Sequence, residues 1–140
     1  MRNRKVFIAG VMQGNRKDGL IYSQGYRKKI SGLLHDIDPT IEVIDPDKTD
    51  PERLNYSDKQ AKKMFFKYCD IASRVNLLIS YLPSASMGSA IEMWSAYNSR
   101  VPIIVISPLK NNWVIKLLSV KVYVSIKELI VVLCITPQSS

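Results

Sequence analysis

Glu92 is the residue of this chain whose setting is best suited to chemistry. It is the one acid in the stretch SYLPSASMGSAIEMWSAYNS, residues 80–99, in which an apolar run and a Pro/Ser loop lead into a helical pattern. Gly88 and Ala96 lie one helical turn before and after it, so the carboxylate stands on a face with very small neighbours. Acids in apolar surroundings are uncommon unless they have a function. The alternative is that Glu92 only complements the positive end of the helix dipole.

The residues that precede Glu92 suit an anionic ligand. They are almost all small, which lets a ligand approach the backbone, and the first turn of the helix offers unpaired N–H groups. We therefore expect a phosphate group beside Ser86 and Gly88. Ser86 could also be a plain helix N-cap, and the two roles are compatible.

The rest of the chain must position this segment. Its sequence pattern predicts strands that alternate with helices. Strands are expected over residues 5–12, 41–44, 76–81, 101–106 and 120–124, and helices over residues 20–34, 57–75, 86–97, 112–118 and 125–133. Strongly apolar strands such as VPIIVI favour a parallel sheet that is covered on both faces. The pattern predicts an α/β fold, a doubly wound (Rossmann/flavodoxin-like) three-layer sandwich with a five-stranded, mostly parallel sheet.

In such a fold ligands bind at the carboxyl ends of the strands. The loops to watch are then residues 10–18, 45–56, 83–92 and 107–112. The first contains Gly10, Gln13 and Gly14, and we expect it to face Ser86 and Gly88 across a phosphate-sized gap. It lacks the spacing of a dinucleotide fingerprint or a Walker loop, so neither NAD nor ATP is expected as a cofactor.

Composition narrows the class of protein further. With 140 residues, 46% of them hydrophobic, the chain is expected to form a single domain over residues 1–140. Cys69 and Cys134 have no zinc-type spacing, so we expect reduced thiols, a cytoplasmic location and no metal site. Charged residues interrupt the apolar C-terminal third too often for a membrane span. The net charge of +8 favours anionic partners, but no aromatic-interleaved pattern points to nucleic acid.

Two segments resemble one known family. FIAGVMQGNRKD, residues 7–18, and YLPSASMGSAIE, residues 81–92, are similar to the nucleoside 2-deoxyribosyltransferase superfamily, and most closely to its nucleoside 5′-monophosphate N-glycosidase branch. The resemblance implies that Glu92 is the catalytic nucleophile. Free-nucleoside enzymes of the family tend to carry Asp six residues earlier, whereas the monophosphate branch carries Ser, and this chain has Ser86. An Asp there would repel a 5′-phosphate, so the resemblance favours a nucleoside monophosphate as substrate.

The chain also departs from the family pattern. The family usually has a Tyr three residues before the strand-end glycine, where its hydroxyl touches the sugar, and this chain has Phe7. That change either leaves room for a ribose or weakens activity. The family's supporting carboxylate would fall near Tyr68, so the candidates for that catalytic role are Asp70 and Asp45.

The resemblance implies cleavage or exchange of an N-glycosidic bond through a covalent glycosyl–Glu92 intermediate, without a cofactor. It further implies a homodimer or larger assembly, in which residues 107–116 help to close a neighbouring site, with Asn112 and Lys116 as substrate-binding candidates. The alternative is a non-catalytic nucleotide or sugar-phosphate binding module on the same fold.

Overall fold

A computed structural model describes residues 3–14, 16–19 and 21–135. These residues form twelve elements. They are β1 (Lys5–Gly10), α1 (Gly25–Ile37), β2 (Glu42–Ile44), α2 (Pro46–Thr49), the short 3-10 helix η1 (Arg53–Asn55), α3 (Asp58–Ala72), β3 (Leu77–Tyr81), α4 (Met87–Asn98), β4 (Ile103–Ile106), α5 (Trp113–Leu118), β5 (Lys121–Tyr123) and α6 (Ile126–Ile135).

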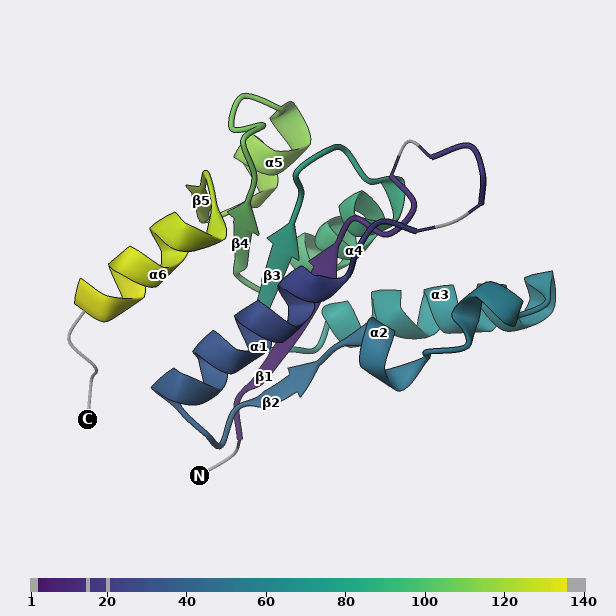
Figure 1. Ribbon diagram of the computed structural model, residues 1–140, viewed down its shortest axis with the longest axis horizontal. Coiled ribbons are helices and arrows are strands. Elements are labelled where there is room, and N and C mark those ends of the chain that lie inside the picture. Colours follow the sequence, from purple (N-terminus) through teal and green to yellow (C-terminus); the bar gives the residue numbers. More distant parts are fainter. Residues whose placement is uncertain (1–2, 15, 20, 136–140) are drawn as a thin grey trace.

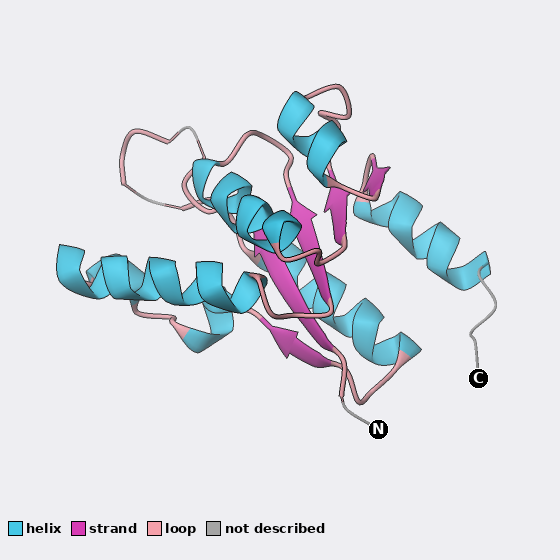
Figure 2. Cartoon of the chain, turned by 180° about the vertical axis from the view of Figure 1, so that it is seen from behind, coloured by secondary structure: helices cyan, strands magenta, loops and turns pink. Residues whose placement is uncertain are grey.

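The five strands form one sheet in the order β2-β1-β3-β4-β5, and all four neighbouring pairs are parallel. α1 and α6 cover one face, in front in Figure 1, while α3, α4 and α5 cover the other, which faces the viewer in Figure 2. The predicted three-layer α/β sandwich is therefore confirmed. Because every strand runs the same way, all the loops that follow strands meet at one edge of the sheet.

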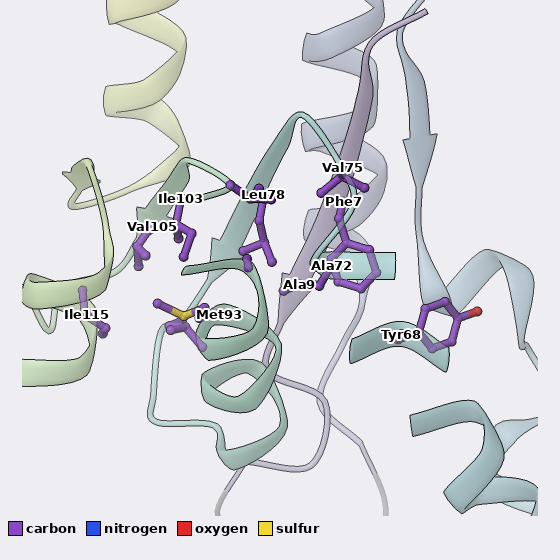
Figure 3. Close-up of a cluster of buried hydrophobic side chains, with 13 residues drawn as sticks. Phe7, Ala9, Tyr68, Ala72, Val75, Leu78, Met93, Ile103, Val105 and Ile115 are labelled. Carbon is purple, nitrogen blue, oxygen red and sulfur yellow. The ribbon is translucent and has the colours of Figure 1, made fainter. Parts of the chain in front are cut away.

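Alternate residues of each strand supply the two cores. On β1, Phe7 and Ala9 point towards α3 and α4, whereas Val6 and Ile8 point towards α1. Figure 3 shows the first of these clusters, in which Met93 of α4 lies against the strands. Both faces of the strands are buried, which explains why their sequences are continuously apolar.

The helix expected over residues 20–34 begins later than predicted. Leu20 lies outside the described residues, and α1 starts only at Gly25. Residues 21–24 are irregular because they bond to the loop after β1. The backbone N–H of Tyr22 donates to the Met12 carbonyl (2.6 Å), and Nε2 of Gln24 donates to the Val11 carbonyl (3.2 Å).

A short sequence pattern correctly predicted where α3 begins, whereas the stretch before it was predicted wrongly. Ser57 and Gln60 form the capping box that the sequence indicated at the start of α3. The stretch 45–56, expected to be a loop, instead contains α2 and η1. The capping side chain of Asp45 and the following proline help to start α2. None of the helices in the described part of the chain is long and apolar enough to cross a membrane.

Candidate functional site

A cavity of about 500 Å³ opens at the carboxyl edge of the sheet, a size typical of small-molecule sites. Four segments line it: the loop after β1, the segment after β2, one side of α3 and the first turns of α4. The lining residues are Gly10, Met12, Gln13, Gly14, Arg16, Ile21, Pro46, Arg53, Leu54, Ala61, Met64, Phe65, Tyr68, Ser86, Met87, Gly88, Ser89 and Glu92.

Glycines shape the loop after β1. A Cβ on Gly10 would lie 2.4 Å from the hydroxyl of Tyr26, so a side chain at the end of the strand would have to displace this buried ring. Gly14 has a φ of 55°, in the left-handed region that glycine adopts most easily. The chain can therefore turn sharply at Gly14 and leave its backbone exposed to the cavity.

The start of α4 presents polar hydrogens to the same cavity. Ser86 is the N-cap, and its Oγ accepts from the N–H of Ser89 (3.3 Å). The side chain of Ser89 is buried, and its Oγ has no hydrogen-bond partner among the described residues. Gly88 has open space where a Cβ would be. These groups and the helix dipole together suit an anion such as a phosphate.

Glu92 is partly buried at the cavity wall, one turn after Gly88. Burial raises the pKa of its carboxyl to about 7, and the positive charge of Arg27 opposes that rise. Near neutral pH the group is therefore divided between the acid and the carboxylate. A carboxyl group in this state can be a nucleophile when it is ionised and a proton donor when it is not.

Arg27, which influences Glu92, is held deep in the molecule. Its guanidinium donates to the Ile8 carbonyl (2.7 Å), to Oε1 of Gln24 (2.8 Å) and to Oδ1 of Asp45 (3.1 Å). The residue is only 2% exposed. Because these bonds hold the guanidinium in place, its positive charge remains close enough to influence Glu92 at the cavity edge.

The structure brings six of the predicted site residues to one cavity. These are Gly10, Gln13, Gly14, Ser86, Gly88 and Glu92. The two small-residue loops therefore do border a common space, as the sequence indicated.

The two proposed supporting acids do not line this cavity. Asp70 is exposed on α3 and pairs with Arg74 (3.0 Å), one turn further along the helix. Asp45 caps α2 through the N–H of Asp47 and pairs with Arg27, so the same Oδ1 accepts from both partners. Neither acid is therefore among the described residues that line the cavity, and a supporting role for either one stays a prediction.

Three other candidates also lie outside the cavity lining. Phe7 is completely buried in the core, with its ring centroid 6.0 Å from that of Tyr68, so it is not placed to touch a sugar. Asn112 caps α5, where its side chain accepts from the N–H groups of Val114 and Ile115. Lys116 is exposed on α5. Contact between these α5 residues and a ligand stays a prediction.

Two buried residues of the segment after β2 were not predicted, and one of them, Arg53, lines the cavity. Asp50 is buried and accepts hydrogen bonds from the hydroxyls of Tyr68 and Tyr56 and from Lys67, and these bonds, that of Tyr68 first, lower the pKa of its carboxyl. The tyrosine at position 68, where the resemblance places a carboxylate, was the one available signal. Arg53 gave none, because the stretch that contains it was expected to be an irregular polar loop.

Comparison with known proteins supports the fold. No protein-family model matches the chain, and no curated protein does so. A 2-deoxyribosyltransferase from Bacillus psychrosaccharolyticus has a similar structure, with a TM-score of 0.67, 15% identity and coverage of 89% of both chains. A conserved protein from Enterococcus faecalis V583 is also similar, with a TM-score of 0.63, 17% identity and coverage of 92% of this chain and 96% of that one.

The raised pKa of Glu92 predicts how stability depends on pH. The folded state holds this proton more tightly than the unfolded chain does, so stability should fall as pH rises from about 4.5 to about 7. Replacing Glu92 with Gln removes the buried charge. It should increase the free energy of unfolding at pH 8 by up to about 3 kcal/mol, and much less at pH 5.

Urea unfolding at the two pH values measures this difference. Glu42→Gln is the matched control, because Glu42 is an exposed carboxylate on β2. An equal effect of Glu92→Gln at pH 5 and pH 8 would contradict the raised pKa.

Proposed function

We propose that this protein cleaves or exchanges the N-glycosidic bond of a nucleoside 5′-monophosphate, with Glu92 as the nucleophile. The observation that carries the proposal is the position of Glu92 in a cavity that also contains the open start of α4. The carboxylate lies one turn beyond the groups that suit a phosphate. This arrangement fits a sugar phosphate bound with its anomeric carbon at Glu92.

The reaction proceeds in two displacements. A carboxylate oxygen of Glu92 forms a bond to C1′ while the bond from C1′ to the base nitrogen breaks, and the electron pair leaves with the base. Water then attacks C1′ and gives a sugar phosphate, or a second base attacks and gives a new nucleotide. Either second step returns Glu92 to its carboxylate form.

The shared fold supports placing the chain in the nucleoside 2-deoxyribosyltransferase superfamily, since one similar structure is a 2-deoxyribosyltransferase. Ser86 at the start of α4 favours the monophosphate branch. A cytoplasmic location fits a substrate of this class.

A second function is a nucleotide-binding module without turnover. It is favoured by the fact that Glu92 is the sole carboxylate among the described residues that line the cavity. A glycosidase normally has a second acid to protonate the leaving group. The two functions differ in whether free base is formed.

Glu92→Gln should abolish base release, because an amide cannot form the glycosyl ester. The wild-type rate should rise with pH and reach half its plateau near pH 7, since only the carboxylate attacks. Chromatography of a panel of ribo- and deoxyribonucleoside monophosphates detects the free base. Full turnover by a folded Glu92→Gln protein would rule out this mechanism, and no turnover by the wild type would favour the binding module.

Ser86→Asp should remove the preference for a 5′-phosphate. The wild type should prefer the monophosphate over the free nucleoside by about 1 to 3 kcal/mol, the scale of hydrogen bonds to a charged group. A carboxylate at position 86 would repel the phosphate dianion, although Asp remains a good N-cap. The ratio of kcat/KM for the two substrates measures the effect, and Ser86→Asn is the uncharged control. An unchanged ratio in Ser86→Asp would place the phosphate elsewhere.

We also propose that the protein is a homodimer or larger assembly, formed through α4 and α5. Large apolar side chains on these neighbouring helices are exposed, including Trp94 (54%) and Trp113 (79%). The Trp94 ring stacks on Tyr97 with centroids 6.0 Å apart. Aromatic residues gathered on one surface are typical of interfaces. A second copy there would bring its own Asn112 and Lys116 near the cavity rim, which Met87 borders.

Trp94→Asp should convert the assembly to a monomer, because it places a charge in an apolar interface. Light scattering after size-exclusion chromatography measures the mass. Val131→Asp, at an exposed apolar position on α6, is the control and should leave the assembly intact. A wild-type protein that is monomeric at micromolar concentration and fully active would refute the proposal.

A further inference from the structure

Arg53 is a buried cation in the cavity wall that the proposed reaction has not yet used. Its Nη2 donates to Oδ1 of Asp47 (2.6 Å), and its Nη1 donates to the backbone carbonyl of Asp50 (3.2 Å). The residue is 9% exposed, and its Nε has no hydrogen-bond partner among the described residues. A guanidinium has five N–H donors, and the described hydrogen bonds of Arg53 use two of them, so donors remain for a ligand in the cavity that Arg53 lines.

Arg53 and the phosphate end of the cavity come from different segments. η1 belongs to the segment after β2 and α4 follows β3, which lie on the two sides of β1 in the sheet, and both segments line the same cavity. Glu92 lies about 9 Å along the α4 axis from Ser86, given the rise per residue of a helix. A nucleotide with its phosphate at Ser86 and its C1′ at Glu92 leaves its base to fill the rest of the cavity, whose lining includes Arg53.

The wall around Arg53 suits a flat, largely apolar ring. It is formed by side chains of α3 and by neighbours of Arg53 in the segment after β2. These residues are Pro46, Leu54, Ala61, Met64, Phe65 and Tyr68. A guanidinium set among such groups offers hydrogen-bond donors but no acceptor. The part of the ring that meets it must therefore carry an acceptor. A carbonyl oxygen projects beyond the ring and can reach a guanidinium held in the wall, whereas the acceptors of adenine are nitrogens within the ring.

A carbonyl acceptor has a direct consequence for the reaction. When the bond between C1′ and the base nitrogen breaks, both electrons remain on the base. In a base whose ring carbonyl is conjugated with that nitrogen, much of the negative charge moves to the oxygen. A cation beside the oxygen stabilises this charge, and fixed donors in a dry site do so strongly.

We infer that Arg53 binds the ring carbonyl of the departing base and stabilises its negative charge, so that the protein acts on oxo-bases rather than on adenine. This inference rests on the proposed function. Glu92 forms its bond to C1′, the base leaves as an anion held by Arg53, and the anion then takes a proton from water. No second carboxylic acid is required, in agreement with Glu92 being the sole carboxylate among the described lining residues.

The test compares leaving groups in wild-type protein and Arg53→Met. The substrates are uridine 5′-monophosphate, its 5-fluoro derivative and adenosine 5′-monophosphate. Fluorine makes the departing anion more stable, so this substrate depends less on Arg53. Arg53→Met should lower kcat/KM for uridine monophosphate about 100-fold, the scale for loss of one fixed donor, and lower it about 10-fold or less for the fluoro derivative.

Two further variants separate this role from a structural one. Arg16→Met removes the other cation among the described residues that line the cavity, and it should lower kcat/KM for both uridine nucleotides by the same factor. Arg53→Lys keeps the charge but lacks the planar set of donors, so its loss should be intermediate. Arg53→Lys also replaces Arg53→Met in the comparison of leaving groups if Arg53→Met does not fold. Equal losses for the two uridine nucleotides in the Arg53 variants would overturn the inference, as would a wild type that releases adenine as fast as uracil.

If the wild type releases no base from any nucleotide, the proposed function fails. Calorimetry of nucleotide binding then decides whether Arg53 contacts a ring carbonyl. A selective loss of affinity for uridine monophosphate over adenosine monophosphate in Arg53→Lys would support the carbonyl contact. Equal affinities for the two nucleotides in the wild type would overturn it.

Discussion

The buried guanidinium of Arg27 is the interaction on which the cavity edge depends. It joins the end of β1, through the Ile8 carbonyl, to Asp45 at the start of α2 and to Gln24 before α1. Three segments that are distant in sequence are thereby fixed around one charge. Removing either member of such a buried pair leaves an uncompensated charge, which is strongly destabilising.

The same cation affects the chemistry of the site. Burial alone would favour the neutral form of Glu92 even more strongly, and the Arg27 charge moderates this effect. The result is a carboxyl group that is neither a permanent acid nor a permanent base at neutral pH. Asp45 partly neutralises Arg27 and so limits how much it favours the carboxylate. Structural pairing and reactivity are thus linked through one guanidinium.

The segment after β2 is the second feature that distinguishes this cavity. Its buried residues, Asp50 and Arg53, make most of their hydrogen bonds within the segment or to α3. This network fixes a guanidinium in the wall. Tyr68, which also lines the cavity, bonds to Asp50. Among the described lining residues, α3 and the segment after β2 contribute a cation and no carboxylate.

Much of the architecture was predictable, because it depends on short-range patterns. The continuous apolar strands indicated a parallel sheet covered on both faces, and the Ser57 capping box fixed the start of α3. The start of α1 was predicted too early, because the bonds that keep residues 21–24 irregular involve the loop after β1. No local pattern records such a contact.

The sequence by itself determined the start of α4. The N-cap Ser86, the small residues around Gly88 and the helical position of Glu92 are all set within seven residues, so periodicity and capping suffice to place them. Only the tertiary structure decided what faces them. Asp70 points to solvent and Asp45 pairs with Arg27, while Arg53 enters the wall. The physical reason is that burial and charge pairing join residues far apart in the chain, and these interactions set both the pKa of Glu92 and the groups that a ligand meets.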